Sequence, residues 1–126
     1  MKKKMTQLIP AAIKAIKAVK IMKDGRIPSV YHGYTSSLGA GIIQAGLLPA
    51  VIFFENSEGD GKKYKLTQAI RILLANDAPE NIHKDYKLSE YLMNLSNPDD
   101  PQIRKKVGEI AVALKIAMRT FKKVES

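Results

Sequence analysis

Histidines and carboxylates are the residues of this 126-residue sequence best suited to acid–base or metal chemistry, but they are few and scattered. The two histidines are His32 and His83, and neither is followed by a His, Asp or Glu at three or four residues. That spacing places two metal ligands on one helix face. We therefore expect solvated or capping histidines and no metal site.

The acidic residues occur in two groups, Glu55, Glu58 and Asp60 in one and Asp99 and Asp100 in the other. A catalytic carboxylate pair needs an apolar or like-charged environment that shifts one pKa. Both groups lie in turns that contain glycine or proline, where water surrounds a carboxylate. The first group also lacks the spacing of a calcium loop. These acids predict helix capping and loop solubility.

No other motif predicts catalysis. Gly39-Ala40-Gly41 lacks the strand and third glycine of a phosphate-binding loop, and Gly59–Lys63 lacks the Ser or Thr. Ser36-Ser37 has no glycines on both sides, as a nucleophile elbow requires. The chain contains no cysteine, which excludes disulfides and thiolate chemistry. We expect no enzymatic activity, cofactor, metal or small-molecule substrate.

The strongest chemical signal is positive charge, because 21 Lys and Arg against 12 Asp and Glu give a net charge of +9. Such a surface attracts phosphate backbones, anionic lipid or an acidic protein. Lys115, Arg119 and Lys122 have the spacing of one helix face, and the first helix would extend this patch if it lies alongside. The candidate RNA-backbone contacts are Lys14, Lys17, Lys20, Lys23, Arg26, Lys115, Arg119 and Lys122.

Contact with nucleic acid is expected to ignore base sequence. No helix-turn-helix pattern with a polar recognition helix is present, so the prediction is phosphate contact without base readout. Tyr31, Tyr34 and Tyr64 have rings that can stack on bases, although packing at a helix boundary explains tyrosines equally well.

Helical periodicity predicts the elements that position these residues. Apolar residues recur at helical spacing over residues 3–23, 64–76, 88–94 and 101–123. Asp24-Gly25 is expected to end the first of these helices. Asp100 and Pro101 suit the N-cap and the first position of the last helix.

The segment Val30–Phe54 contains no charged residue. Its apolar part, Leu38–Phe54, reaches the lower limit for a membrane span, but it also contains glycines, a glutamine and Pro49. We expect a central core helix over residues 29–56, with a kink at Ala45–Leu48 caused by Pro49. The predicted fold is all-α: a single-domain antiparallel bundle, residues 1–126, of about five helices around this kinked apolar helix. The absence of cysteine and of a signal-peptide pattern favours the cytoplasm.

The segment Tyr34–Phe53 (YTSSLGAGIIQAGLLPAVIF) resembles the signature helix of the small all-helical subunit of type III-B CRISPR (Cmr) effector complexes. In that family a Tyr is followed by a spacer, an apolar run into a Gly-Leu pair, and an Ala-rich turn that ends in Phe. The order of helices is also similar, from a basic first helix to a last helix with basic and aromatic residues at its end.

The resemblance implies a non-catalytic subunit that lies along the guide–target duplex beside the subunits that hold the CRISPR RNA. Its implied partners are the other Cmr subunits and RNA, which it contacts without sequence specificity in antiviral defence. The alternative is a basic helical protein–protein adaptor without a nucleic-acid role.

Overall fold

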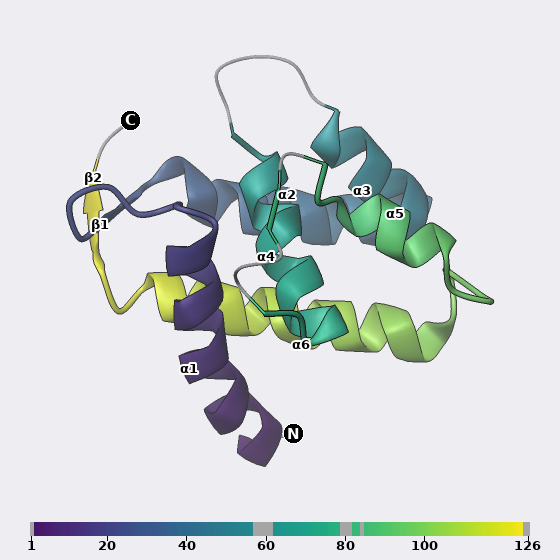
Figure 1. Cartoon of the computed structure of the whole chain (residues 1–126), viewed down its shortest axis with the longest axis horizontal. Coiled ribbons are helices and arrows are strands. Elements are labelled where there is room, and N and C mark those ends of the chain that lie inside the picture. The colour runs from purple at the N-terminus through teal and green to yellow at the C-terminus, as the bar shows by residue number, and fades with distance from the viewer. Residues whose placement is uncertain (1, 57–61, 79–81, 84, 125–126) are drawn as a thin grey trace.

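The computed structural model describes residues 2–56, 62–78, 82–83 and 85–124, and these are mostly helical (Figure 1). The helices are α1 (Lys2–Ala18), α2 (Val30–Ala45), α3 (Leu47–Glu55), α4 (Tyr64–Ala75), α5 (Leu88–Met93) and α6 (Pro101–Met118). The strands are β1 (Arg26–Pro28) and β2 (Lys122–Val124). The predicted all-α class is confirmed, with one small strand pair added.

Helix α1 ends earlier than predicted, because a left-handed residue stops it before Gly25. Lys20 has a φ of 61°, and the amide N–H of Ile21 donates to the carbonyl of Ile16 at 3.2 Å. This is a Schellman motif, in which apolar residues at both ends of the turn pack together, and Ile16 and Ile21 are both buried. Lys20 and Lys23 therefore lie beyond the helix.

The predicted helix over residues 29–56 is two helices that meet at Gly46. Gly46 has φ 93° and ψ 165°, a conformation that is essentially restricted to glycine. Pro49 lies in the first turn of α3, where no N–H is needed for a helical hydrogen bond. The break falls within the predicted interval Ala45–Leu48, but Gly46 makes the turn.

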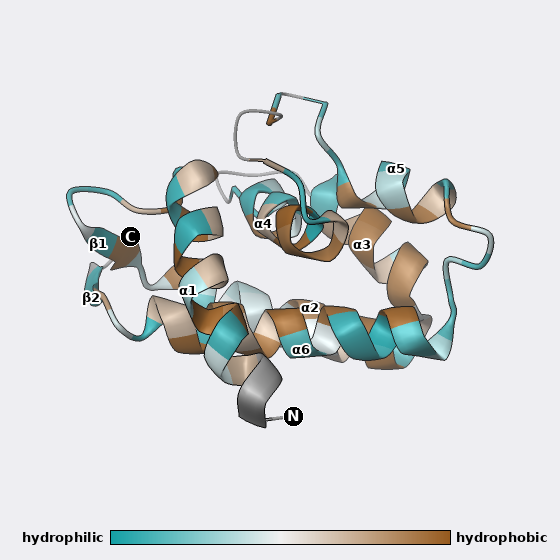
Figure 2. Cartoon of the chain, turned by 60° about the horizontal axis from the view of Figure 1, so that its bottom comes forward, coloured by the Kyte–Doolittle hydropathy of each residue, from teal (hydrophilic) through white to brown (hydrophobic). Residues whose placement is uncertain are grey.

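The innermost helix is α4, which contacts each of the other five helices. Its buried residues are Leu66, Thr67, Gln68, Ala69, Ile70, Ile72 and Leu74. Helix α2, which was expected in this position, buries Tyr31, Thr35 and Leu38 and exposes Gly33, Ser36, Ser37, Ala40, Ile43, Gln44 and Ala45. Gly, Ala and Ser carry little apolar area, so an uncharged helix gains little from burying them. Figure 2 shows how pale much of α2 is on the hydropathy scale beside the brown ribbon of α3.

Two distant parts of the chain meet in the parallel pair of β1 and β2, which places Arg26 opposite Lys122 and Ile27 opposite Lys123. The last helix therefore ends at Met118 and not near Lys123. Ile27 is fully buried and anchors the pair to the core. Figures 1 and 2 show that α1 crosses α6 steeply and does not run antiparallel to it. Within the described residues, no helix has the length and apolar character to cross a membrane.

Glu55 joins α3 to α5 by capping the beginning of α5. Its carboxylate accepts hydrogen bonds from the Ser89 amide at 3.1 Å and the Ser89 hydroxyl at 2.5 Å. A carboxylate satisfies the free N–H groups of a helix N-terminus and interacts favourably with the helix dipole. We expect Glu55→Gln to lower the free energy of unfolding by about 1–2 kcal/mol in urea titrations.

The matched control for this variant is Glu90→Gln. Glu90 is exposed and its carboxylate lies 3.9 Å from Arg71 Nη1, a surface contact worth about 0.5 kcal/mol or less. Equal losses in the two variants would contradict the capping role of Glu55.

Candidate nucleic-acid interface

The eight cations predicted to contact RNA lie on α1 and around the ends of α1 and α6. Two of them, Lys14 and Lys17, are exposed on α1, and three follow that helix, namely Lys20, Lys23 and Arg26. Lys115 lies on α6, and Arg119 and Lys122 lie after its end. Helices α1 and α6 pack against each other, as a shared patch requires. Because α6 ends at Met118, the predicted helix face of Lys115 and Arg119 does not extend to Lys122.

The strand pair brings cations from both halves of the chain together at one end of the molecule (Figure 1). Arg26 and Lys122 are exposed and occupy paired positions in the sheet, and Lys23 forms an isolated bridge with Arg26. Three of the predicted contacts are therefore neighbours through backbone pairing.

A first cluster surrounds Lys65, at the beginning of α4. The Lys65 ammonium donates a hydrogen bond to the Lys20 carbonyl at 3.0 Å. Burial lowers the pKa of Lys65, and the charges of Lys62, Lys23 and Lys20 lower it further. Like charges thus meet here without a carboxylate among the groups that act on Lys65. We call Lys20, Lys23, Lys62 and Lys65 the Lys65 cluster.

A second cluster surrounds His32, in the first turn of α2. The Lys115 ammonium donates a hydrogen bond to the Ser36 hydroxyl at 3.0 Å, which joins α6 to α2. Burial lowers the pKa of His32, and the charges of Lys123, Arg119 and Lys115 lower it further. The His32 cluster consists of His32, Ser36, Lys115, Arg119 and Lys123.

Several members of these clusters were not among the predicted contacts. The basic run before and into α4, which contains Lys62 and Lys65, was a usable signal because it directly precedes an amphipathic helix. His32 was expected to be solvated or capping, but its Nε2 atom is buried. No local pattern reveals that cations from the end of α6 act on it, because these residues lie far apart along the chain.

The tyrosines divide between packing and exposure. Tyr31 is buried, its hydroxyl lies 3.4 Å from the Lys62 carbonyl, and burial together with Tyr34 and Tyr64 raises its pKa to about 12. Tyr34 packs edge-on against Tyr31 and Phe54. The Tyr31 and Tyr34 rings therefore pack within the protein, whereas the Tyr64 ring is half exposed.

The acidic residues and His83 have structural contacts. The Asp100 carboxylate accepts a hydrogen bond from the Gln102 amide at 2.8 Å, which confirms the predicted N-cap of α6. His83 is exposed, and its Nδ1 atom accepts a hydrogen bond from the Asp85 amide at 3.2 Å. Glu58 and Asp60 lie outside the described residues. Among those that are described, no three His, Asp or Glu side chains are grouped as a metal site would require.

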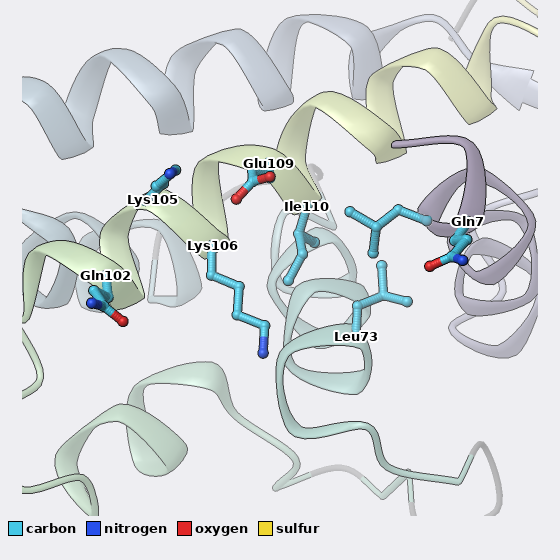
Figure 3. Close-up of a pocket in the computed structure, with 8 residues that line it drawn as sticks. Gln7, Leu73, Gln102, Lys105, Lys106, Glu109 and Ile110 are labelled. Atoms are coloured by element: carbon cyan, nitrogen blue, oxygen red, sulfur yellow. The ribbon is translucent and has the colours of Figure 1, made fainter. Parts of the chain in front are cut away.

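A cavity of 640 Å³ lies where α1, α4 and α6 meet (Figure 3). Leu8, Leu73 and Ile110 form its apolar wall, with Gln7, Gln102, Lys105, Lys106 and Glu109 around them. Glu109 is the one carboxylate among the described residues that line it.

Comparison with known proteins assigns the chain to a family. The family model described as CRISPR-associated protein (Cas_Cmr5) matches residues 8–115, which run from within α1 to the last turn of α6. No curated protein and no solved structure matches the chain. The chain therefore belongs to the Cas_Cmr5 family, the small subunit of type III-B CRISPR complexes, and is a subunit that associates with other Cmr proteins.

Proposed function

We propose that this subunit is non-catalytic and holds the backbone of the guide–target RNA duplex in the Cmr effector, without reading its sequence, in antiviral defence in the cytoplasm. The observation that carries the proposal is the pair of cation clusters at the ends of α1 and α6. Within the described residues, the one salt bridge is Arg71–Glu90, so no cluster cation is paired with a carboxylate. Cations without counter-ions attract phosphates.

The test is the salt dependence of RNA affinity. About five phosphate contacts to a single strand give a slope of about −3.5 in log K against log salt, which is about a 100-fold loss of affinity between 50 and 200 mM salt. Fluorescence anisotropy with labelled single-stranded RNA and with an RNA duplex measures this slope. Two unrelated sequences are expected to bind alike. An affinity that is unchanged between these salt concentrations would contradict the proposal.

Charge-removal variants locate the contact. The triple variant Lys20→Gln, Lys23→Gln, Lys62→Gln removes three exposed cations of the Lys65 cluster. It is expected to flatten the slope by about 2, because it removes three phosphate contacts. The matched control removes Arg104, Lys105 and Lys106, three exposed cations at the other end of α6, and is expected to keep the slope.

The second candidate function is a protein–protein adaptor. Two large apolar side chains favour it, Ile43 on α2 and Phe53 on α3, which are 87% and 81% exposed. The double variant Ile43→Ser, Phe53→Ser, compared with the triple variant, separates the two functions. An adaptor loses co-purification with the other Cmr subunits in the double variant, and its RNA affinity stays the same in the triple variant. An RNA-backbone subunit loses RNA affinity in the triple variant.

A further inference from the structure

The His32 cluster combines side chains from three elements near one half-buried imidazole, whose Nε2 atom is buried. His32 and Ser36 lie one turn apart on α2, Lys115 and Arg119 lie at the end of α6, and Lys123 lies in β2. The Lys115–Ser36 hydrogen bond of 3.0 Å fixes α6 against α2 at this point. The positive charges of Lys115, Arg119 and Lys123 all act on His32 and lower its pKa.

The His32 ring has a polar atom to which no described residue is hydrogen-bonded. Its Nε2 atom is buried and has no hydrogen-bond partner within the described part of the chain. The neighbouring hydroxyls do not donate to the ring. Those of Thr35 and Ser36 both donate to the backbone carbonyl of His32, at 2.8 and 3.5 Å. A buried nitrogen without a hydrogen-bond partner destabilises the fold, so its position calls for a partner.

The positive charges of the cluster favour an anion as that partner. Lys115, Arg119 and Lys123 form no salt bridge with any described carboxylate. Three cations that repel one another are stabilised by a negative charge placed between them. The Ser36 hydroxyl accepts from Lys115, and its own bond to the backbone is long, so its hydrogen can turn to a ligand.

We propose that the His32 cluster binds one phosphate group of an RNA backbone. Several donors converge here from three elements, and a tetrahedral phosphate accepts from several directions, whereas the two oxygens of a carboxylate lie in one plane with its carbon. The inference rests on the proposed function and names one contact point within it.

Binding at this point is coupled to the charge of His32. A bound anion favours the imidazolium and raises the pKa of His32 from its lowered value. By reciprocity, the imidazolium strengthens anion binding, so affinity increases as the pH falls from 8 to 5. The charged groups that act on the ring are Lys115 and Arg119 from the α6 end and Lys123 from β2.

The experiment uses the full chain and observes the imidazole C–H signals of its two histidines by NMR between pH 5 and 8. The probe is dimethyl phosphate, whose charge stays constant over this range, against sodium chloride at equal ionic strength. We expect dimethyl phosphate to raise the titration midpoint of His32 by about half a pH unit or more, equivalent to about threefold tighter binding at pH 5 than at pH 8. The His83 curve is the internal reference and is expected to stay the same.

Two variants place the effect in the cluster. Lys115→Gln combined with Arg119→Gln is expected to abolish the response of His32 to dimethyl phosphate. Lys105→Gln, which removes an exposed cation from the same helix, is expected to preserve it. Thermal unfolding of each variant verifies that the fold is intact. A His32 response that equals that in chloride, or that survives in the double variant, would overturn the phosphate site.

A uridine hexanucleotide then separates this inference from the proposed function. A hexanucleotide that binds and moves the His32 signal supports both. Binding that leaves the His32 signal unmoved overturns the site and leaves the RNA-backbone function standing. A response to dimethyl phosphate without hexanucleotide binding supports a phosphate site but overturns its assignment to RNA.

Discussion

The Ile70→Ala variant loses about 2–5 kcal/mol of the free energy of unfolding, because it removes a branched apolar side chain from the most enclosed helix. Ile70 is fully buried in α4, and α4 contacts all the other helices. A cavity at this position therefore weakens packing against several elements at once. For a domain of this size the expected fall in Tm is roughly 8–20 °C, measured by thermal and urea unfolding.

Ile43→Ala is the matched control, since it makes the same truncation in a helix at a site that is 87% exposed. Its unfolding free energy is expected to change by about 0.5 kcal/mol or less. Equal losses in both variants would mean that α4 is not the inner helix. The comparison also tests the fold against the expectation from sequence, in which the segment containing Ile43 formed the centre.

The Gly46→Ala variant is expected to lose about 1–3 kcal/mol, because alanine must adopt a backbone conformation that is nearly exclusive to glycine. The space around Gly46 is not the obstacle. A Cβ atom there would lie 3.6 Å from the Asp99 carboxylate and 3.8 Å from Pro49 Cδ, which is ordinary contact. The loss therefore measures backbone strain at the junction of α2 and α3, and urea unfolding records it.

Gly39→Ala is expected to raise the free energy of unfolding, in contrast to Gly46→Ala. Gly39 lies within α2, and a Cβ atom at this position meets nothing within 4 Å. Alanine there restricts the unfolded chain and favours the helix, with a gain of about 0.5–1 kcal/mol. Destabilisation in both variants, or in neither, would contradict the glycine turn at Gly46.

Local pattern was sufficient to predict which segments are mostly helical, because helix formation depends on spacing within a few turns, but it placed the ends of α1 and α6 too late and joined α2 and α3 into one helix. The apolar periodicity of residues 64–76 corresponds to α4, and Asp100 with Pro101 begins α6 as predicted. The resemblance over Tyr34–Phe53 also identified the family that the match over residues 8–115 confirms. Net charge predicts an anionic partner, since charge is a property of composition alone, and RNA as that partner stays a prediction.

Tertiary structure alone decided which helix is buried and which cations meet. The Lys115–Ser36 hydrogen bond joins residues 79 positions apart, and the Lys65–Lys20 bond joins residues 45 apart. The pairing of Arg26 with Lys122 depends on two three-residue strands that have no periodicity of their own. The sequence by itself determined which segments are mostly helical, because helix formation depends on local spacing. It also determined the net positive charge, because charge is a sum over residues. The position of the two cation clusters depended on long-range packing, which no spacing along the chain encodes.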